Sequence, residues 1–66
     1  MEIHVNGQPH QLAESTTLAE LVNQLDLEPR HIAIEVNLKL IPRADHVHYR
    51  LSDGDRLEVV TLVGGG

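Results

Sequence analysis

The chain begins with a short run of alternating polar and apolar residues, which Asn6-Gly7 separates from a second short run. An Asn-Gly pair suits a two-residue type I′ turn, because both of its central residues need positive φ. The pattern therefore predicts a hairpin within residues 1–12. In the register that this turn sets, His4 faces Pro9 as a non-hydrogen-bonded pair, whose N–H groups point away from the hairpin. Since Pro9 has no N–H group, we expect the second strand at an edge of the sheet and the first strand further inside.

A helix is predicted after the hairpin. Thr17 and Glu20 have the spacing of a capping box, in which each side chain accepts a hydrogen bond from the other residue's backbone N–H. The apolar residues that follow fall at i, i+3, i+4 and i+7, which places them in one stripe along a helix. These residues are Leu18, Leu21, Val22 and Leu25. Pro29 is expected to end the helix soon afterwards.

The middle of the chain predicts two short strands joined by a turn. Apolar and more polar residues alternate through residues 32–36, which is the period of a strand with one buried face. Asn37-Leu38 is expected to turn the chain into a short extended piece at 39–41, which the next proline ends. Residues 43–48 have no clear period and are expected to be irregular or to form one brief turn.

The last predicted strand is the most apolar segment of the chain. An Asp-Gly-Asp turn at residues 53–55 precedes it, and β-branched residues are frequent in residues 57–63. The two-residue period places Glu58, Val60 and Leu62 on one face. Because Glu58 is charged, this face is expected to be partly solvated, which would leave Val60 and Leu62 as exposed apolar residues.

The order of hairpin, helix, short strands and last strand predicts the fold class. A single amphipathic helix buries its stripe against one face of a sheet, and the other face then stays open. The sequence therefore predicts an α+β fold of the β-grasp, ubiquitin-like type, with a mixed sheet of four to five strands and one helix packed on one face. Residues 1–63 are expected to form this single domain. Residues 64–66, all glycine, are expected to form a mobile C-terminal tail.

Composition narrows the range of functions. A chain of 66 residues forms one small domain, which buries only about 60% of the surface that its unfolded form exposes. Such a core leaves little room for an enclosed substrate cavity, so an enzyme with a buried active site is disfavoured. The sequence contains no Cys, which excludes disulfides, thiolate metal sites and a cysteine nucleophile.

Charge and hydropathy bear on the partners. The formal net charge of −5 argues against nucleic acid, because phosphate binding depends on clustered Lys and Arg. It favours protein partners with basic surfaces instead. No apolar run is long enough to span a membrane, and the start of the chain lacks a basic segment followed by an apolar one. We therefore expect no membrane association and a cytoplasmic location.

Two groups of polar residues could suggest a metal site or a pair of catalytic carboxylates. The sequence contains five histidines: His4, His10, His31, His46 and His48. His46 and His48 would share a face if their segment were extended, but no Cys supports a metal site, so we expect solvated surface histidines and no bound metal. Asp53 and Asp55 flank a glycine and are expected to form a turn rather than a pair of catalytic carboxylates.

Three stretches of the sequence carry a resemblance to a known family. They are Val5-Asn6-Gly7 with Thr16-Thr17-Leu18-Ala19-Glu20-Leu21, then Ala33-Ile34-Glu35-Val36-Asn37 through Ile41-Pro42-Arg43, and finally Asp53-Gly54-Asp55-Arg56 leading to Leu62-Val63-Gly64-Gly65-Gly66. Together they resemble the ubiquitin-like sulfur carriers of thiamine biosynthesis, over essentially the whole chain. The sequence departs from that pattern at Leu38, where many relatives have Gly, and at residues 46–49.

The resemblance implies a function and its partners. In that family an ATP-dependent, E1-like adenylyltransferase adenylates the terminal glycine carboxylate, sulfur replaces the AMP, and the thiocarboxylate donates sulfur to thiazole synthase. It implies that Gly66 is the modified residue, that Gly64 and Gly65 form a slim tail, and that a sulfur donor enzyme such as a cysteine desulfurase takes part. The chain would then be a cosubstrate without catalytic residues or a bound cofactor of its own. The exposed Val60 and Leu62 are candidate partner-binding residues.

Elementary chemistry explains why such a tail would need activation. A chain-terminal carboxylate has a pKa of about 3.3–3.7, so it is ionised at pH 7 and repels nucleophiles. Adenylation supplies a leaving group, and glycines without Cβ can thread into a partner's active site. Two alternatives stay open: a sulfur carrier subunit of a molybdopterin synthase would use the same chemistry, and a ubiquitin-like modifier would form an isopeptide bond to lysine.

Overall fold

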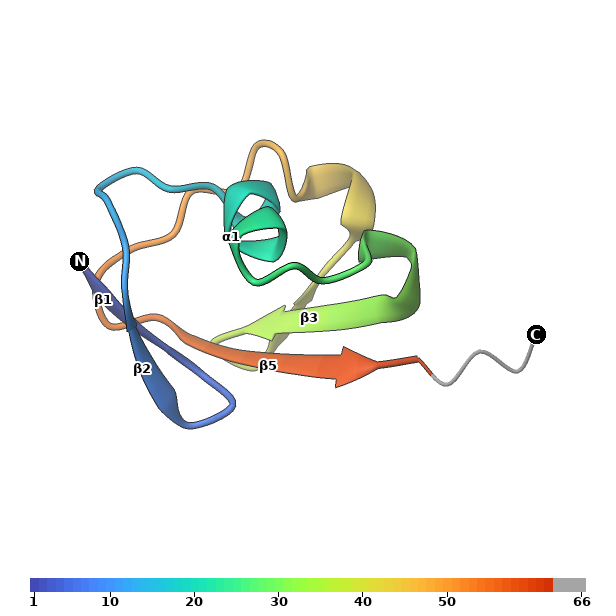
Figure 1. The fold of residues 1–66 in the computed structure, drawn as a ribbon, viewed down its shortest axis with the longest axis horizontal. Helices are drawn as coiled ribbons and strands as arrows, with labels where there is room; N and C mark the ends of the chain where they lie inside the picture. Colours follow the sequence, from blue (N-terminus) through green and yellow to red (C-terminus); the bar gives the residue numbers. More distant parts are fainter. Residues whose placement is uncertain (63–66) are drawn as a thin grey trace.

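The computed structural model describes residues 1–62 and shows a five-stranded mixed sheet with one α-helix on one of its faces (Figure 1). The strand order in the sheet is β2-β1-β5-β3-β4. The elements in chain order are β1 (Glu2–Val5), β2 (Gln8–Gln11), α1 (Leu18–Gln24), the 3₁₀ turn η1 (Pro29–His31), β3 (Ile32–Val36), β4 (Lys39–Ile41), the 3₁₀ turn η2 (Arg43–Asp45) and β5 (Arg56–Thr61). This arrangement confirms the predicted β-grasp fold.

The first hairpin forms as predicted. Asn6 and Gly7 have φ values of 49° and 83°, the positive values that a type I′ turn needs. His4 lies opposite Pro9 in the antiparallel register, and within residues 1–62 β2 is an edge strand that pairs with β1 alone. β1 pairs on its other side with β5 in parallel, so the missing N–H of Pro9 interrupts no ladder.

Helix α1 begins at the predicted capping box. The backbone N–H of Thr17 donates to Glu20 Oε1 at 2.7 Å, and the backbone N–H of Glu20 donates to Thr17 Oγ1 at 3.2 Å. These reciprocal bonds satisfy donors that the first turn of a helix otherwise leaves without a partner. Three residues of the apolar stripe, Leu18, Leu21 and Val22, are buried against the sheet.

The end of α1 differs from the prediction. The helix ends well before Pro29, because Asp26 adopts a left-handed conformation with φ 59°. The N–H of Asp26 donates to the carbonyl of Asn23, and the N–H of Leu27 donates to the carbonyl of Val22. This is the bond pattern of a Schellman motif, which closes a helix without a proline. Pro29 instead begins η1.

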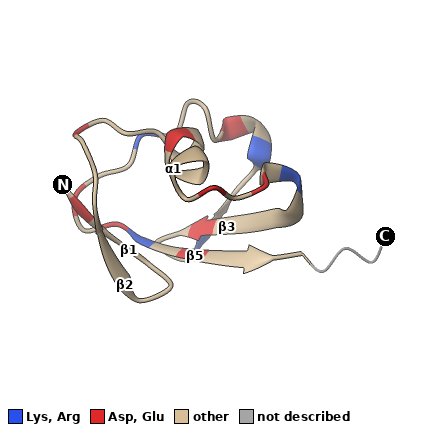
Figure 2. Cartoon of the chain, in the orientation of Figure 1, with Lys and Arg blue, Asp and Glu red and all other residues tan. Residues whose placement is uncertain are grey.

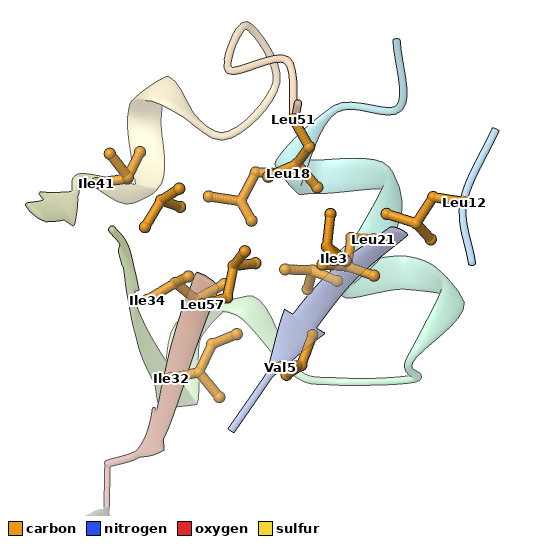
Figure 3. Close-up of a cluster of buried hydrophobic side chains, with 12 residues drawn as sticks. Ile3, Val5, Leu12, Leu18, Leu21, Ile32, Ile34, Ile41, Leu51 and Leu57 are labelled. Carbon is orange, nitrogen blue, oxygen red and sulfur yellow. The ribbon is translucent and has the colours of Figure 1, made fainter. Parts of the chain in front are cut away.

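The hydrophobic core lies between α1 and one face of the sheet (Figure 3). Side chains from β1, α1, β3 and β5 meet there, and Leu51 closes the cluster from the segment before β5. Because a strand points successive side chains to opposite faces, the residues between the buried ones face the other side of the sheet. In residues 1–62 no helix covers that second face (Figure 1), which we call the open face.

The turn before β5 forms hydrogen bonds to β1 and to the turn between β3 and β4. Asp53 Oδ1 accepts a hydrogen bond from the Glu2 backbone N–H at 2.7 Å. Asp55 is buried, and its carboxylate accepts from the backbone N–H of Ser52 and from Asn37 Nδ2. Each aspartate thus holds backbone or turn geometry, as predicted for turn-forming residues.

One histidine was predicted wrongly. His46 is not a solvated surface residue, because only 4% of it is exposed. Its Nε2 lies 3.1 Å from the carbonyl oxygen of Ile41, which can only accept, so Nε2 carries the proton. Its own carbonyl accepts from the N–H of Ala19 in the first turn of α1. The segment around η2 is not extended, so His46 and His48 do not share a strand face.

Candidate functional site

The candidate site is the open face around the end of β5. Along this strand Leu57 is buried and Val59 half-buried on the side of α1, whereas Glu58 and Val60 are exposed on the open face. Val60 is 54% exposed and Leu62 is 48% exposed. The predicted exposure of these two apolar residues is therefore confirmed. Their role in binding a partner stays a prediction.

The β3–β5 register gathers further side chains around them. Ala33 lies opposite Val60, and Glu35 lies opposite Glu58. Leu40 of β4 lies opposite Glu35 on its other side and is 59% exposed. We call the residues Glu35, Leu40, Glu58, Val60 and Leu62 the open-face patch. Leu40 could not be assigned to it from the sequence, because a three-residue strand gives too short a pattern to fix its face.

The end of β5 is held on the side of β3. The N–H of Leu62 donates to the carbonyl of His31 at 2.6 Å, which continues the β3–β5 ladder past the last paired residues. His31 belongs to η1, whose start is capped by Glu28. The Nε of Arg30 donates to Glu28 Oε1 at 3.1 Å, and this bond, followed by that from the Arg30 backbone N–H, lowers the pKa of Glu28 below its usual value.

On the side of β1, the side chain of Asn6 pairs with β5 beyond the end of the strand. Asn6 Nδ2 donates to the carbonyl of Val59 at 3.2 Å, and the N–H of Val59 donates to Asn6 Oδ1 at 2.9 Å. The amide group of Asn6 thus imitates one further residue of a parallel strand. The sequence predicts only the turn role of Asn6, and no local signal indicates the second role, because Val59 lies far away in the sequence.

A surface hollow of about 400 Å³ lies between the two hairpin turns, beside the first half of β5, and shares Glu58 with the open-face patch. His4, Arg56 and Glu58 contribute polar side chains to it. Within the described part of the chain no hydrogen bond or ion pair joins these three side chains. The hollow therefore lacks the linked donors and acceptors of an acid–base catalytic site.

Two further findings concern residues 1–62. No three His, Asp or Glu side chains among them come together in a group that could hold a metal ion. No helix in this part of the chain has the length and apolar character needed to cross a membrane. The predicted modification site, Gly66, and the tail residues Gly64 and Gly65 lie outside the described residues.

A family comparison decides the assignment. The model of the ThiS family matches residues 3–66, which includes all three glycines at the end of the sequence. The chain belongs to the ThiS family. These proteins are the ubiquitin-like sulfur carriers of thiamine biosynthesis, so the predicted family and its role in making the thiazole of thiamine are confirmed.

Individual ThiS relatives agree with this assignment. The chain is 32% identical to the sulfur carrier protein ThiS of Escherichia coli over the full length of both proteins. Its fold matches the crystal structure of the thiamine biosynthesis protein ThiS from Geobacter metallireducens with a TM-score of 0.86, at 30% identity and with both chains fully covered. It is also 33% identical to a thiazole synthase of Paramagnetospirillum magneticum, but it spans only 20% of that protein's length.

Proposed function

We propose that this ThiS-family chain is a protein cosubstrate that carries sulfur on the carboxyl group of Gly66. The family match through residue 66 carries this proposal, because it includes the glycines on which the chemistry depends. The exposed apolar residues Val60 and Leu62, which lie shortly before the tail in the sequence, support docking on a partner.

The proposed reaction has two steps on partner enzymes. An E1-like adenylyltransferase binds ATP, and an oxygen of the Gly66 carboxylate attacks the α-phosphorus to give an acyl adenylate and pyrophosphate. A hydrosulfide-level sulfur nucleophile then attacks the activated carbonyl, and AMP leaves, which yields the thiocarboxylate. This chain supplies the carboxyl group and a docking surface, and ATP is bound by the partner.

The proposed partners follow from this sequence of steps. Besides the activating enzyme, a sulfur donor enzyme such as a cysteine desulfurase provides the sulfur as a persulfide, and a thiol reductant supplies the two electrons that release it at the hydrosulfide level. Thiazole synthase then receives the sulfur from the thiocarboxylate. The thiazole synthase of Paramagnetospirillum magneticum contains a segment similar to this chain, and that segment makes up a fifth of the enzyme. This similarity supports the partnership with thiazole synthase. All of these steps are proposed to occur in the cytoplasm.

Intact-mass measurement tests the proposal. The chain is incubated with the activating enzyme, ATP and a sulfur source, and we expect replacement of one oxygen by sulfur at Gly66. Deletion of Gly66 should abolish loading and leave the thermal unfolding midpoint nearly unchanged. Conjugates to lysine would indicate a modifier instead, and a stable synthase complex that makes molybdopterin would indicate the other carrier class. A mature chain that continues past Gly66 would contradict the proposal.

The docking role of the β5 end has its own test. Leu62→Asp should weaken binding to the activating enzyme without unfolding the domain, because Leu62 is about half exposed and outside the core. Val47→Asp is the matched control, since Val47 is 59% exposed and lies in the loop after η2, away from the open face. Equal affinities of the two variants would exclude Leu62 from the docking surface.

A further inference from the structure

Two carboxylates face one another on the open face. Glu35 and Glu58 are direct partners in the antiparallel β3–β5 register. The bond from the Asn37 N–H to the Arg56 carbonyl, two residues along, makes Glu35 and Glu58 a hydrogen-bonded pair with Cβ atoms about 5.5 Å apart. Figure 2 shows the two acidic segments on the neighbouring strands β3 and β5. Like charges placed directly opposite destabilise a sheet.

Within residues 1–62 no ion pair joins either carboxylate to a basic side chain. The one salt bridge within residues 1–62 joins Arg30 and Glu28, in the segment before β3. Arg56 shares the open face with Glu58, two residues away along β5, yet the two side chains form no ion pair there. Lys39 occupies a position of β4 that points to the face of α1. Among these residues, the carboxylates of Glu35 and Glu58 are thus left without an ion-pair partner.

Apolar side chains surround the acidic pair. Leu40 lies opposite Glu35 in the β3–β4 register, and Val60 follows Glu58 by one strand period. Leu62 continues the same face, and all three are about half exposed or more. A protein that covers them excludes water from the two carboxylates. Removing carboxylates from water is costly unless a cation takes the place of the lost hydration.

This combination limits what can cover the patch. A purely apolar surface would leave two carboxylates buried and unpaired. A second copy of the chain would bring four carboxylates together, and each copy carries a formal net charge of −5. A basic side chain within an apolar surface satisfies both requirements, and arginine does so best, because its planar group of donors can bond to two carboxylates at once.

We propose that the open-face patch docks on the activating enzyme at a site where an arginine guanidinium lies between the carboxylates of Glu35 and Glu58. Apolar side chains of that enzyme then pack on Leu40, Val60 and Leu62. This inference rests on the proposed function, because it takes the partner from there. It adds that the partner is recognised by charge as well as by apolar contact.

The test uses two readouts whose expected changes have opposite signs. Glu58→Gln and Glu35→Gln should each weaken binding to the purified activating enzyme by about tenfold or more, since the hydrogen-bond acceptor loses its negative charge. The same variants should keep or raise the thermal unfolding midpoint, because the repulsion is removed. Glu14→Gln, on an exposed loop before α1, changes the net charge equally and should leave affinity within about twofold of the original.

Three results would overturn the inference. One is an affinity of Glu58→Gln equal to that of Glu14→Gln, and another is a clear fall of its unfolding midpoint, which would make the acidic pair a structural support. The third is dimerisation of the unaltered chain through this face in sedimentation experiments. Sulfur loading of the unaltered chain at saturating enzyme is measured alongside. If the unaltered chain is loaded with sulfur but neither Gln variant changes the affinity for the activating enzyme, only this inference is refuted. If the unaltered chain is not loaded, the proposed function is refuted.

Discussion

One residue in the turn between β3 and β4, Leu38, has a backbone conformation that is unfavourable for a residue with a side chain. Leu38 has φ 70°, and its side chain is 86% exposed. The left-handed region costs a residue with a Cβ about 1–2 kcal/mol relative to the right-handed one, whereas Gly visits it freely. We therefore predict that Leu38→Gly stabilises the domain. The preceding Asn37, at φ 52°, tolerates the left-handed region better.

The size of the effect follows from two opposing contributions. Relief of the strained φ raises the free energy of unfolding by about 1–2 kcal/mol, and the greater freedom of Gly in the unfolded chain lowers it by about 0.4–1 kcal/mol. Loss of the side chain adds little, because Leu38 is almost fully exposed. The expected net gain is about 0.5–1 kcal/mol. For a domain of this size this corresponds to a rise of the unfolding midpoint by about 2–8 °C.

Thermal and urea unfolding followed by circular dichroism measure this change. Leu38→Ala is the matched control, because it removes most of the side chain and keeps the Cβ and hence the strain. We expect its midpoint close to that of the original chain. A Leu38→Gly midpoint no higher than that of Leu38→Ala would refute the assignment of strain to this position. In the reverse direction, Gly54→Ala should destabilise, since Gly54 has φ 86°.

Three further predictions concern the helix start and the end of β5. Thr17→Ala should lower the free energy of unfolding by about 1 kcal/mol, because the capping box is lost, whereas Thr17→Ser should keep most of it. A hydrogen bond from the Thr17 backbone N–H, and then one with the Thr17 side chain, lower the pKa of Glu20 in the folded protein. The stabilisation from this carboxylate is therefore complete at a pH above its unfolded pKa and is lost as the pH falls through its lower folded pKa. Glu20→Gln should therefore lose less stability than the original chain on acidification from about pH 6 to pH 3 in urea titrations, and an identical loss would contradict the assignment. Asn6→Gly keeps a residue suited to φ 49° but loses both bonds to Val59, so it should cost about 1 kcal/mol and speed hydrogen exchange of the Val59 amide; unchanged exchange would show that the side chain does not hold β5.

The sequence predicted the features that depend on residues close together in the chain. The Asn6-Gly7 turn, the Thr17–Glu20 capping box and the edge position of Pro9 each follow from a local requirement of the backbone. The two-residue period of β5 predicted that Val60 would be exposed, because alternation needs no knowledge of neighbouring strands. Family membership also followed from sequence motifs, and the glycines concerned lie outside the described residues.

The tertiary structure decided what depends on residues far apart. Periodicity placed Glu58 on a face but could not show that Glu35 lies opposite, because the register between β3 and β5 is set by bonds across the sheet. The burial of His46 arises only where the η2 segment packs near α1. A pattern along one strand or helix carries no information on which segment will cover it, so such contacts appear only when the whole chain is folded.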